Sequence, residues 1–172
     1  MTEPYRMPVV DLDAIAERLG ESGRRVEVLW QHSESLAFVA RGREYRSEFH
    51  LNPSDEVMYT IRGELRLHSR QPDGTEVVDV IPEGSAIFTP SRLPHSPRFD
   101  PDAFIIVIER LRRPGELDRF QWFCQGCGEF LHEESCHVAD YSTDPVGQAY
   151  QRFFDDEQAR TCDNCGEVLQ PY

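Results

Sequence analysis

The chain has 172 residues, which is most simply one domain with a small appendage, and this length can bury a sizeable core. Its 18 basic and 31 acidic residues give a formal net charge of -13 at pH 7, so nucleic acid and anionic membrane surfaces are not expected partners. No apolar run approaches the roughly 20 residues of a membrane span, and residues 1–13 do not read as a secretory signal, so we expect a cytoplasmic protein.

The first 112 residues predict a helix followed by a β-barrel. Residues 11–20 have the pattern of a short amphipathic helix that ends at Gly20. The next segments are short, rich in β-forming residues and separated by turns such as Gln71–Gly74, where proline and glycine favour a hairpin. About eight such strands indicate an all-β fold, an antiparallel barrel or jelly roll. They are expected at residues 24–31, 35–42, 43–51, 56–63, 64–70, 76–84, 85–90 and 103–111.

The pattern changes after residue 112. A first cysteine turn is followed by a strand-like stretch, and residues 144–162 have helical spacing of Val146, Tyr150 and Phe153. A second cysteine turn follows. We therefore expect a barrel with its N-terminal helix at residues 1–112 and a C-terminal extension packed on it at residues 113–172.

Four of the five cysteines form two C-x-x-C pairs, Cys124/Cys127 and Cys162/Cys165. In a reducing compartment this arrangement indicates a metal site, because each tight turn lets two thiolates reach one ion. Four thiolates suit tetrahedral iron or zinc. The fifth, Cys136, is expected to be a small buried or half-buried residue.

A second metal site is predicted from His50, Glu56 and His95. His50 and Glu56 flank a proline-containing turn just before a strand, and His95 follows a glycine-and-proline segment. Two imidazoles and one carboxylate on one face suit ferrous iron and leave the opposite face free for substrate and dioxygen. Taken alone, His50 and Glu56 have the alternative of a solvated surface turn.

The spacing of these residues resembles the paired motifs of the cupin superfamily, with Asn52 where a further histidine ligand often stands. Several stretches resemble, more narrowly, the bacterial 3-hydroxyanthranilate 3,4-dioxygenase family. The similarity runs from about residue 26 to the C-terminus. It is carried by LWQ, YRSEFH, MYTIRGE, FTPSRLPHSP, VIERLRRPGELDRFQWFCQGCG and CDNCG.

The resemblance implies that His50, Glu56 and His95 bind the catalytic iron(II). It implies that Arg46 contacts substrate and bound oxygen, and that Glu109 forms hydrogen bonds to, or exchanges a proton with, the substrate amine and hydroxyl. The alternative for Glu109 is a strand-end glutamate paired with Arg110 or Arg112.

The implied reaction opens the ring of 3-hydroxyanthranilate or a close ortho-aminophenol. Both atoms of O2 enter the product, 2-amino-3-carboxymuconate semialdehyde, on the route to quinolinate and NAD. The resemblance also implies a rubredoxin-like cysteine site that holds iron, and a homodimer.

Two positions depart from the family pattern. Phe99 stands where the family has a second carboxylate-binding arginine, and Val26 stands where it has an asparagine. Arg98 takes the arginine's role only if a one-residue gap is allowed, because strand alternation otherwise turns it to the wrong face.

Two other functions stay open. One is a non-catalytic cupin that binds a small ligand. The other is a different cupin enzyme, such as an isomerase, or a dioxygenase that acts on another substituted aminophenol or a catechol in secondary metabolism.

Overall fold

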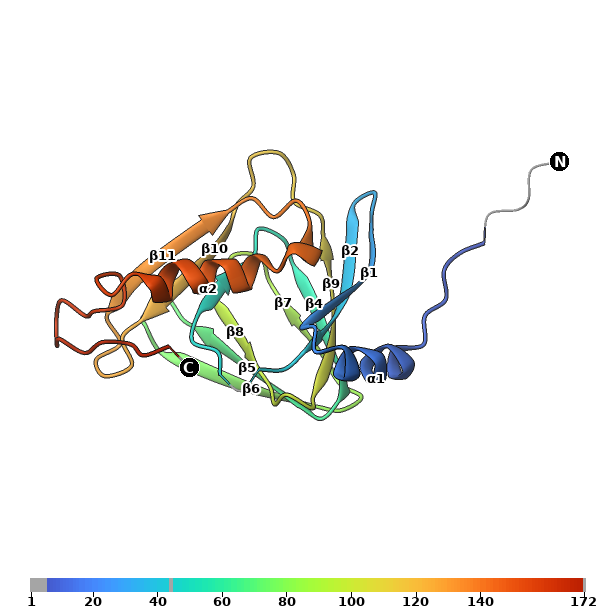
Figure 1. Ribbon diagram of the computed structural model, residues 1–172, viewed down its shortest axis with the longest axis horizontal. Coiled ribbons are helices and arrows are strands. Elements are labelled where there is room, and N and C mark those ends of the chain that lie inside the picture. Colours follow the sequence, from blue (N-terminus) through green and yellow to red (C-terminus); the bar gives the residue numbers. More distant parts are fainter. Residues whose placement is uncertain (1–5, 44, 172) are drawn as a thin grey trace.

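The computed structural model describes residues 6–43 and 45–171. Within this part of the chain, eleven strands form two facing antiparallel sheets, with one α-helix before them and one after them (Figure 1). The expected fold class, a mainly β antiparallel barrel with a cysteine-bearing C-terminal region, is confirmed. No helix in the described residues has both the length and the apolar character of a membrane span.

The first sheet has five strands. In spatial order they are β1 (Val26–His32), β2 (Ser35–Arg41), β9 (Phe104–Arg110), β4 (Glu56–Arg62) and β7 (Ala86–Thr89).

The second sheet has six strands. In spatial order they are β11 (Phe130–Cys136), β10 (Asp118–Phe123), β3 (Phe49–Leu51), β8 (His95–Arg98), β5 (Glu64–Arg70) and β6 (Glu76–Pro82).

The main core lies between the two sheets. Alternate residues of the strands point inward, because side chains along a strand alternate between its two faces. Phe38, Met58 and Val107 of the first sheet meet Leu65 and Leu67 of the second, and each is at most 4% exposed. At one end this apolar packing gives way to polar side chains, and the candidate site lies there.

Helix α1 (Leu12–Ser22) covers the outer face of the first sheet with Ile15, Ala16 and Leu19. The Asp11 side chain accepts a hydrogen bond from the Ala14 amide at 3.1 Å and caps the helix N-terminus. The expected end at Gly20 is wrong by two residues. The helix continues to Ser22 and is capped by Gly23, whose φ of 71° lies in the left-handed region that glycine tolerates.

Helix α2 (Pro145–Asp155) lies across β11 and forms a separate apolar cluster with β10 (Figure 1). Phe153 stacks on Trp122 with ring centroids 4.2 Å apart, and both side chains are fully buried. A one-turn 3-10 helix, η1 (Tyr141–Thr143), precedes α2.

The strand predictions were right for all eight expected segments, although in residues 43–51 only β3 forms. Strands β8 and β10 were not expected. β8 is short and contains Pro97, and β10 lies after residue 112, where the strand pattern of the barrel breaks off in the sequence. Because β10 pairs with β3, residues beyond 112 continue the second sheet. The division of the chain at residue 112 stays a prediction.

Candidate metal centre and substrate pocket

His50, Glu56 and His95 come from both sheets and meet inside the barrel. His50 on β3 and His95 on β8 are cross-strand partners in the second sheet. Glu56 is the first residue of β4 in the first sheet. Each offers a ligand atom, and these atoms lie within 4.8 Å of one another. The barrel therefore brings together three residues that are up to 45 positions apart in the sequence.

The chemistry of this cluster fits a metal ion. The three residues are between 1% and 3% exposed. Glu56 Oε2 and His95 Nε2 lie 2.8 Å apart, yet their geometry does not make a hydrogen bond and neither atom has another hydrogen-bond partner in the described residues. Buried polar atoms left without partners are costly, and a cation between them would satisfy both.

The charges of the three groups respond to one another. Burial alone would raise the pKa of Glu56, but the neighbouring His95, His50 and Asn52 together outweigh burial and lower that pKa to about 2. Burial lowers the pKa of His50, which favours the neutral imidazole that a metal requires. Burial opposes a proton on His95, but the Glu56 carboxylate raises the pKa of His95 above its ordinary value. Glu56 is thus an anion, His50 favours the neutral form, and a metal would take the place of the His95 proton.

A second set of buried polar residues surrounds the cluster. Asp118 on β10 accepts a hydrogen bond from His50 Nε2 at 2.7 Å. An N–H that is donated to a carboxylate leaves the other ring nitrogen with the lone pair that a metal needs, and it also orients the ring. Arg112 binds Asp118 with two hydrogen bonds of 2.6 Å.

Glu109 lies directly opposite Glu56 in the β4–β9 ladder and is also buried. Its oxygens accept hydrogen bonds from Arg112 Nη1, at 2.9 Å, and from the Asn52 amide. Burial and the nearby Glu56 charge raise the pKa of Glu109 to about 7, although Arg112 opposes the rise. The sequence offered two alternatives for Glu109, a place near the substrate or an ion pair with Arg110 or Arg112. In the structure Glu109 lies beside the cluster and also pairs with Arg112.

Sequence reasoning missed Asp118 and the role of Arg112 as its partner. The segment around Asp118 carried no metal-ligand spacing, and its contact with His50 depends on β10 lying beside β3. The one available signal was the alternation of Asp118, Phe120 and Trp122, which is that of a strand with one buried face.

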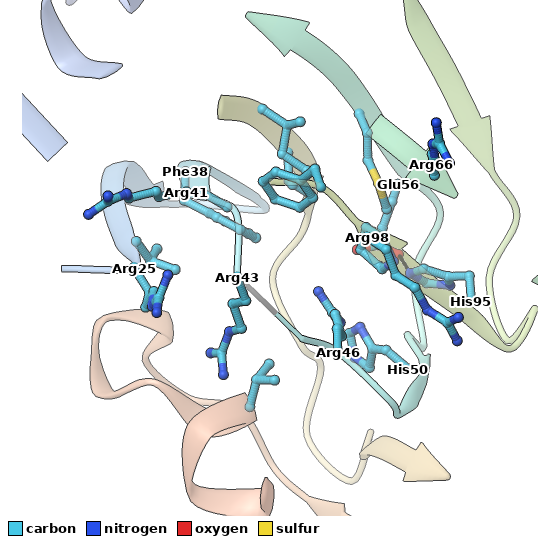
Figure 2. A pocket seen from close by; sticks show the side chains of 18 of the residues that line it. Arg25, Phe38, Arg41, Arg43, Arg46, His50, Glu56, Arg66, His95 and Arg98 are labelled. Carbon is cyan, nitrogen blue, oxygen red and sulfur yellow. Dashed lines mark ion pairs between the residues drawn. The ribbon is translucent and has the colours of Figure 1, made fainter. Parts of the chain in front are cut away.

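The cluster opens into a cavity of about 460 Å³. Among the described residues, six arginines line it, although the whole chain is acidic. They are Arg25, Arg41, Arg43, Arg46, Arg66 and Arg98. Figure 2 shows the three cluster residues at one side of the cavity with Arg46 beside them. Glu64, Asp100 and Asp144 line it too, so the wall carries an excess of positive charge. A buried polar floor and a wall of net positive charge suit a small anionic ligand.

Arg46 lies in the loop between β2 and β3, where its side chain is 16% exposed. Its Nε lies 2.6 Å from the buried Glu48 carboxylate. The guanidinium therefore has a fixed position on the cavity wall next to the cluster (Figure 2).

Arg98 borders the cavity, but its guanidinium is engaged on the outer side of the second sheet. It contacts the Ser96 hydroxyl at 3.3 Å and Glu76 at 3.5 Å, and it lies over the Phe49 ring. Strand alternation from His95 places it there. Phe99 and Val26, the two departures from the family pattern, both line the cavity.

The four cysteines of the C-x-x-C pairs also come together. Cys124 Sγ lies 3.5 Å from Cys165 Sγ, and Cys127 Sγ lies 3.6 Å from Cys162 Sγ. A tetrahedral ion with metal–sulfur bonds of about 2.3 Å would place its sulfurs about 3.8 Å apart, so the cluster fits such an ion with little adjustment.

The two cysteine turns have the same local structure. In the first, Cys124 N donates to Glu129 O and Gly128 N donates to Cys124 O. In the second, Cys162 and Gly166 repeat both bonds with equivalent partners. Gly128 and Gly166 have φ values of 76° and 75°, which favour glycine. The backbone N–H of Glu129 lowers the pKa of Cys127 to about 7, which favours a thiolate there, while burial raises the pKa of Cys124.

Comparison with known proteins identifies the family. The family model described as 3-hydroxyanthranilic acid dioxygenase matches residues 25–154. The chain belongs to the 3-hydroxyanthranilic acid dioxygenase family. The match includes the three residues of the buried cluster, Arg46, Glu109 and the first cysteine pair.

Relatives of this dioxygenase family occur in bacteria and in a fungus. A Bacillus cereus protein named 3-hydroxyanthranilate 3,4-dioxygenase is 35% identical over 83% of this chain and 79% of its own. Proteins of the same name from Ruegeria pomeroyi and Podospora anserina are 35% and 36% identical, over 81% and 76% of this chain and 77% and 71% of their own. The family expected from the sequence motifs is confirmed.

A solved structure supports the fold. Protein BH2720 from Bacillus halodurans superposes with a TM-score of 0.51 at 14% identity, covering 64% of this chain and 86% of its own. Membership of a dioxygenase family implies a metal-dependent catalytic site that acts on a small aromatic substrate and O2.

Proposed function

We propose that this protein opens the aromatic ring of 3-hydroxyanthranilate with O2 and gives 2-amino-3-carboxymuconate semialdehyde. The observation that carries the proposal is the buried His50, Glu56 and His95 cluster at the floor of a cavity with a cationic wall. Membership of the dioxygenase family supports the same reaction.

We propose iron(II) as the catalytic metal, with His50, Glu56 and His95 as its protein ligands. Two imidazoles and one carboxylate on one face are the ligand set of non-haem iron oxygenases. When bound, iron(II) relays electrons between the aromatic ring and O2 and orients both.

The chain's own residues bind and orient the substrate. Arg46 is proposed to bind the carboxylate of the substrate, since a guanidinium presents paired N–H donors to such an anion. Its contact with the Glu48 carboxylate, which uses Nε, fixes the side chain before substrate arrives. The apolar residues around the cavity, among them Phe38, Met58 and Val107, would pack on the ring and exclude water.

Glu109 is proposed to exchange a proton with the substrate hydroxyl or amine. It lies beside the cluster, opposite Glu56, and is held by Arg112 and Asn52. A carboxyl group that is buried next to another carboxylate can hold a proton near neutral pH and pass it on.

The cysteine site is proposed to hold iron or zinc and to stabilise the C-terminal extension. All four positions of a tetrahedral ion would be filled by Cys124, Cys127, Cys162 and Cys165, and a closed site of this kind is mainly structural. From the family resemblance we also propose that the protein is a cytoplasmic homodimer. Size-exclusion chromatography with light scattering can measure its oligomeric state.

A second candidate substrate is favoured by the cavity wall. Val26 and Phe99 are apolar where the family has an asparagine and an arginine, and the Arg98 guanidinium is engaged elsewhere. This part of the wall would suit an ortho-aminophenol or a catechol with an apolar substituent better than a substrate whose carboxylate needs a second arginine.

The test is an assay of purified protein loaded anaerobically with iron(II). We expect 3-hydroxyanthranilate and air to give coupled loss of O2 and appearance of the semialdehyde absorbance, with one O2 consumed per substrate. Consumption of neither reactant by iron-loaded protein would exclude this substrate. Turnover of 2-aminophenol or a catechol in its place, under the same conditions, would favour the second candidate.

A further inference from the structure

The C-terminal segment forms part of the wall of the substrate cavity. Tyr141, Asp144 and Val146, which lie in η1 and at the start of α2, line it together with residues of the barrel. The neighbouring part of the wall is the loop that joins β2 to β3 and carries Arg46. Residues 45–48 of this loop lie outside any strand, so side-chain contacts must hold them in place.

The strongest of these contacts is made by Tyr150 on α2. Its hydroxyl accepts a hydrogen bond from the Ser47 backbone N–H at 2.7 Å and donates one to Glu48 Oε2. The other oxygen of Glu48, Oε1, lies 2.6 Å from Arg46 Nε, and Glu48 is fully buried. The tyrosine hydroxyl, the carboxylate and the guanidinium therefore form one continuous chain from α2 to the cavity.

A second contact links the loop directly to the cysteine site. Gln125, between Cys124 and Cys127 in the first cysteine turn, donates a hydrogen bond from Nε2 to the Tyr45 hydroxyl at 2.5 Å. Tyr45 lines the cavity. The turn that would hold the metal is thus in contact with the loop that carries Arg46.

A third contact lies near the start of α2. Arg43 Nη2 is 3.5 Å from Asp144 Oδ1, and its guanidinium lies 5.7 Å from the centre of the Tyr150 ring. Figure 2 shows the Arg43 side chain directed away from the cluster and toward the helical C-terminal segment. The loop is therefore attached to this segment at both of its ends.

We propose that Tyr150 is a positioning residue for Arg46, and that the metal in the cysteine site sets substrate affinity by holding the C-terminal segment against the loop. This inference rests on the proposed function for its substrate. The ring of Tyr150 belongs to the apolar cluster of α2, where it packs on Trp122 and Phe154. The hydrogen bonds to Ser47 and Glu48 are made by the hydroxyl alone, so they can be removed while the ring and its contacts stay.

The test compares Tyr150→Phe with Tyr59→Phe in iron-loaded protein. Tyr59 packs near α1 on the outer face of the first sheet, so its change is a matched control for a lost hydroxyl. We expect anaerobic titration with 3-hydroxyanthranilate to give a Kd about tenfold higher for Tyr150→Phe, the loss expected of a hydrogen bond to a charged group, with kcat within about twofold of wild type. Tyr59→Phe should leave both values unchanged.

Hydrogen exchange supplies a readout that needs no substrate. The peptide that covers residues 45–48 should exchange faster in Tyr150→Phe than in wild type or Tyr59→Phe, because the Ser47 amide loses its acceptor. Removal of the cysteine-site metal by Cys162→Ser should speed exchange in the same peptide. Unchanged Kd and unchanged exchange in Tyr150→Phe would overturn the inference.

Failure of the inference and failure of the proposed function are distinguishable. If wild-type protein does not bind 3-hydroxyanthranilate, the proposed substrate is wrong, and the exchange measurement alone decides whether Tyr150 holds the loop. If Tyr150→Phe does not fold, Gln125→Ala replaces it, since Gln125 is exposed and its loss leaves the core intact. We expect Gln125→Ala to raise Kd about threefold, the effect of a neutral hydrogen bond, and a wild-type Kd would contradict the link through the cysteine turn.

Discussion

The two candidate metal sites differ in ligand number, burial and access. The His50, Glu56 and His95 cluster is built from both sheets, is buried, and opens into a cavity. The cysteine cluster is built from two turns of the C-terminal region, has Cys127 and Cys165 exposed, and none of its described cysteines lines that cavity.

We propose that this difference separates a site that can react from one that stabilises structure. Three protein ligands leave coordination positions for substrate and O2, while four thiolates fill a tetrahedral ion. The expected reactivity follows from free coordination positions and not from solvent exposure, since the more exposed cysteine cluster would leave its ion no free position. Removal of a ligand should therefore chiefly lower turnover at the His50, Glu56 and His95 cluster and chiefly lower stability at the cysteine cluster.

The largest expected effect is on turnover. His50→Ala or Glu56→Ala should lower it about 10³-fold or more, because two protein ligands do not hold the metal in a reactive geometry. O2 uptake measures the loss, and elemental analysis should show that the cysteine-site metal stays. His68→Ala, on the outer face of β5, serves as the control. Wild-type turnover in either ligand variant would break the assignment of these residues.

The next effect is on stability. Cys162→Ser should lower the free energy of unfolding by several kcal/mol, because a structural metal contributes folding free energy. Thermal denaturation and metal content measure this, with Cys136→Ser as the matched control outside the cluster. An unchanged melting temperature with full metal content would contradict a stabilising role for the cysteine site.

A smaller effect is expected at the partner of His50. Asp118→Asn should weaken metal binding at the catalytic site about 10- to 100-fold, since the neutral amide orients the imidazole less well. Competition with a chelator gives the affinity, and Asp79→Asn on exposed β6 is the control. Equal affinity in wild type and Asp118→Asn would show that the hydrogen bond to His50 does not tune the metal.

The smallest effect comes from an ion pair that belongs to neither cluster. The hydrogen bond from Arg110 lowers the pKa of Glu116 from 4.5 to about 2. A depressed carboxyl pKa adds stability above pH 4.5, and that stability is lost as pH falls toward 2. Glu116→Gln should therefore cost about 0.5–1 kcal/mol at pH 7, and denaturant titrations should show this difference shrinking below pH 4.5. A constant difference from pH 7 to pH 2 would contradict the ion pair.

The sequence predicted those parts of the site that depend on local spacing. His50, Glu56 and Arg46 lie within eleven residues, and the two cysteine turns are each complete motifs. The strands around them were recognisable because their side chains alternate or are rich in β-branched residues. These features depend on neighbours in the chain, so no tertiary information was needed.

The remaining parts depend on which strands lie side by side. Asp118 reaches His50 across 68 positions because β10 pairs with β3, and no local pattern specifies that pairing. The same holds for the link from Tyr150 to Glu48, which spans 102 positions. The direction of Arg98 could be stated only as a pair of alternatives, since it depends on whether β8 contains an irregularity between His95 and that residue.

The most direct test of the account is anomalous diffraction at the iron edge from crystals of iron(II)-loaded protein. We predict a peak within bonding distance of His50, Glu56 and His95, with its remaining coordination positions facing the cavity beside Arg46. A catalytic pocket without iron in fully loaded protein, or an ion enclosed there by further protein ligands, would contradict the central claim.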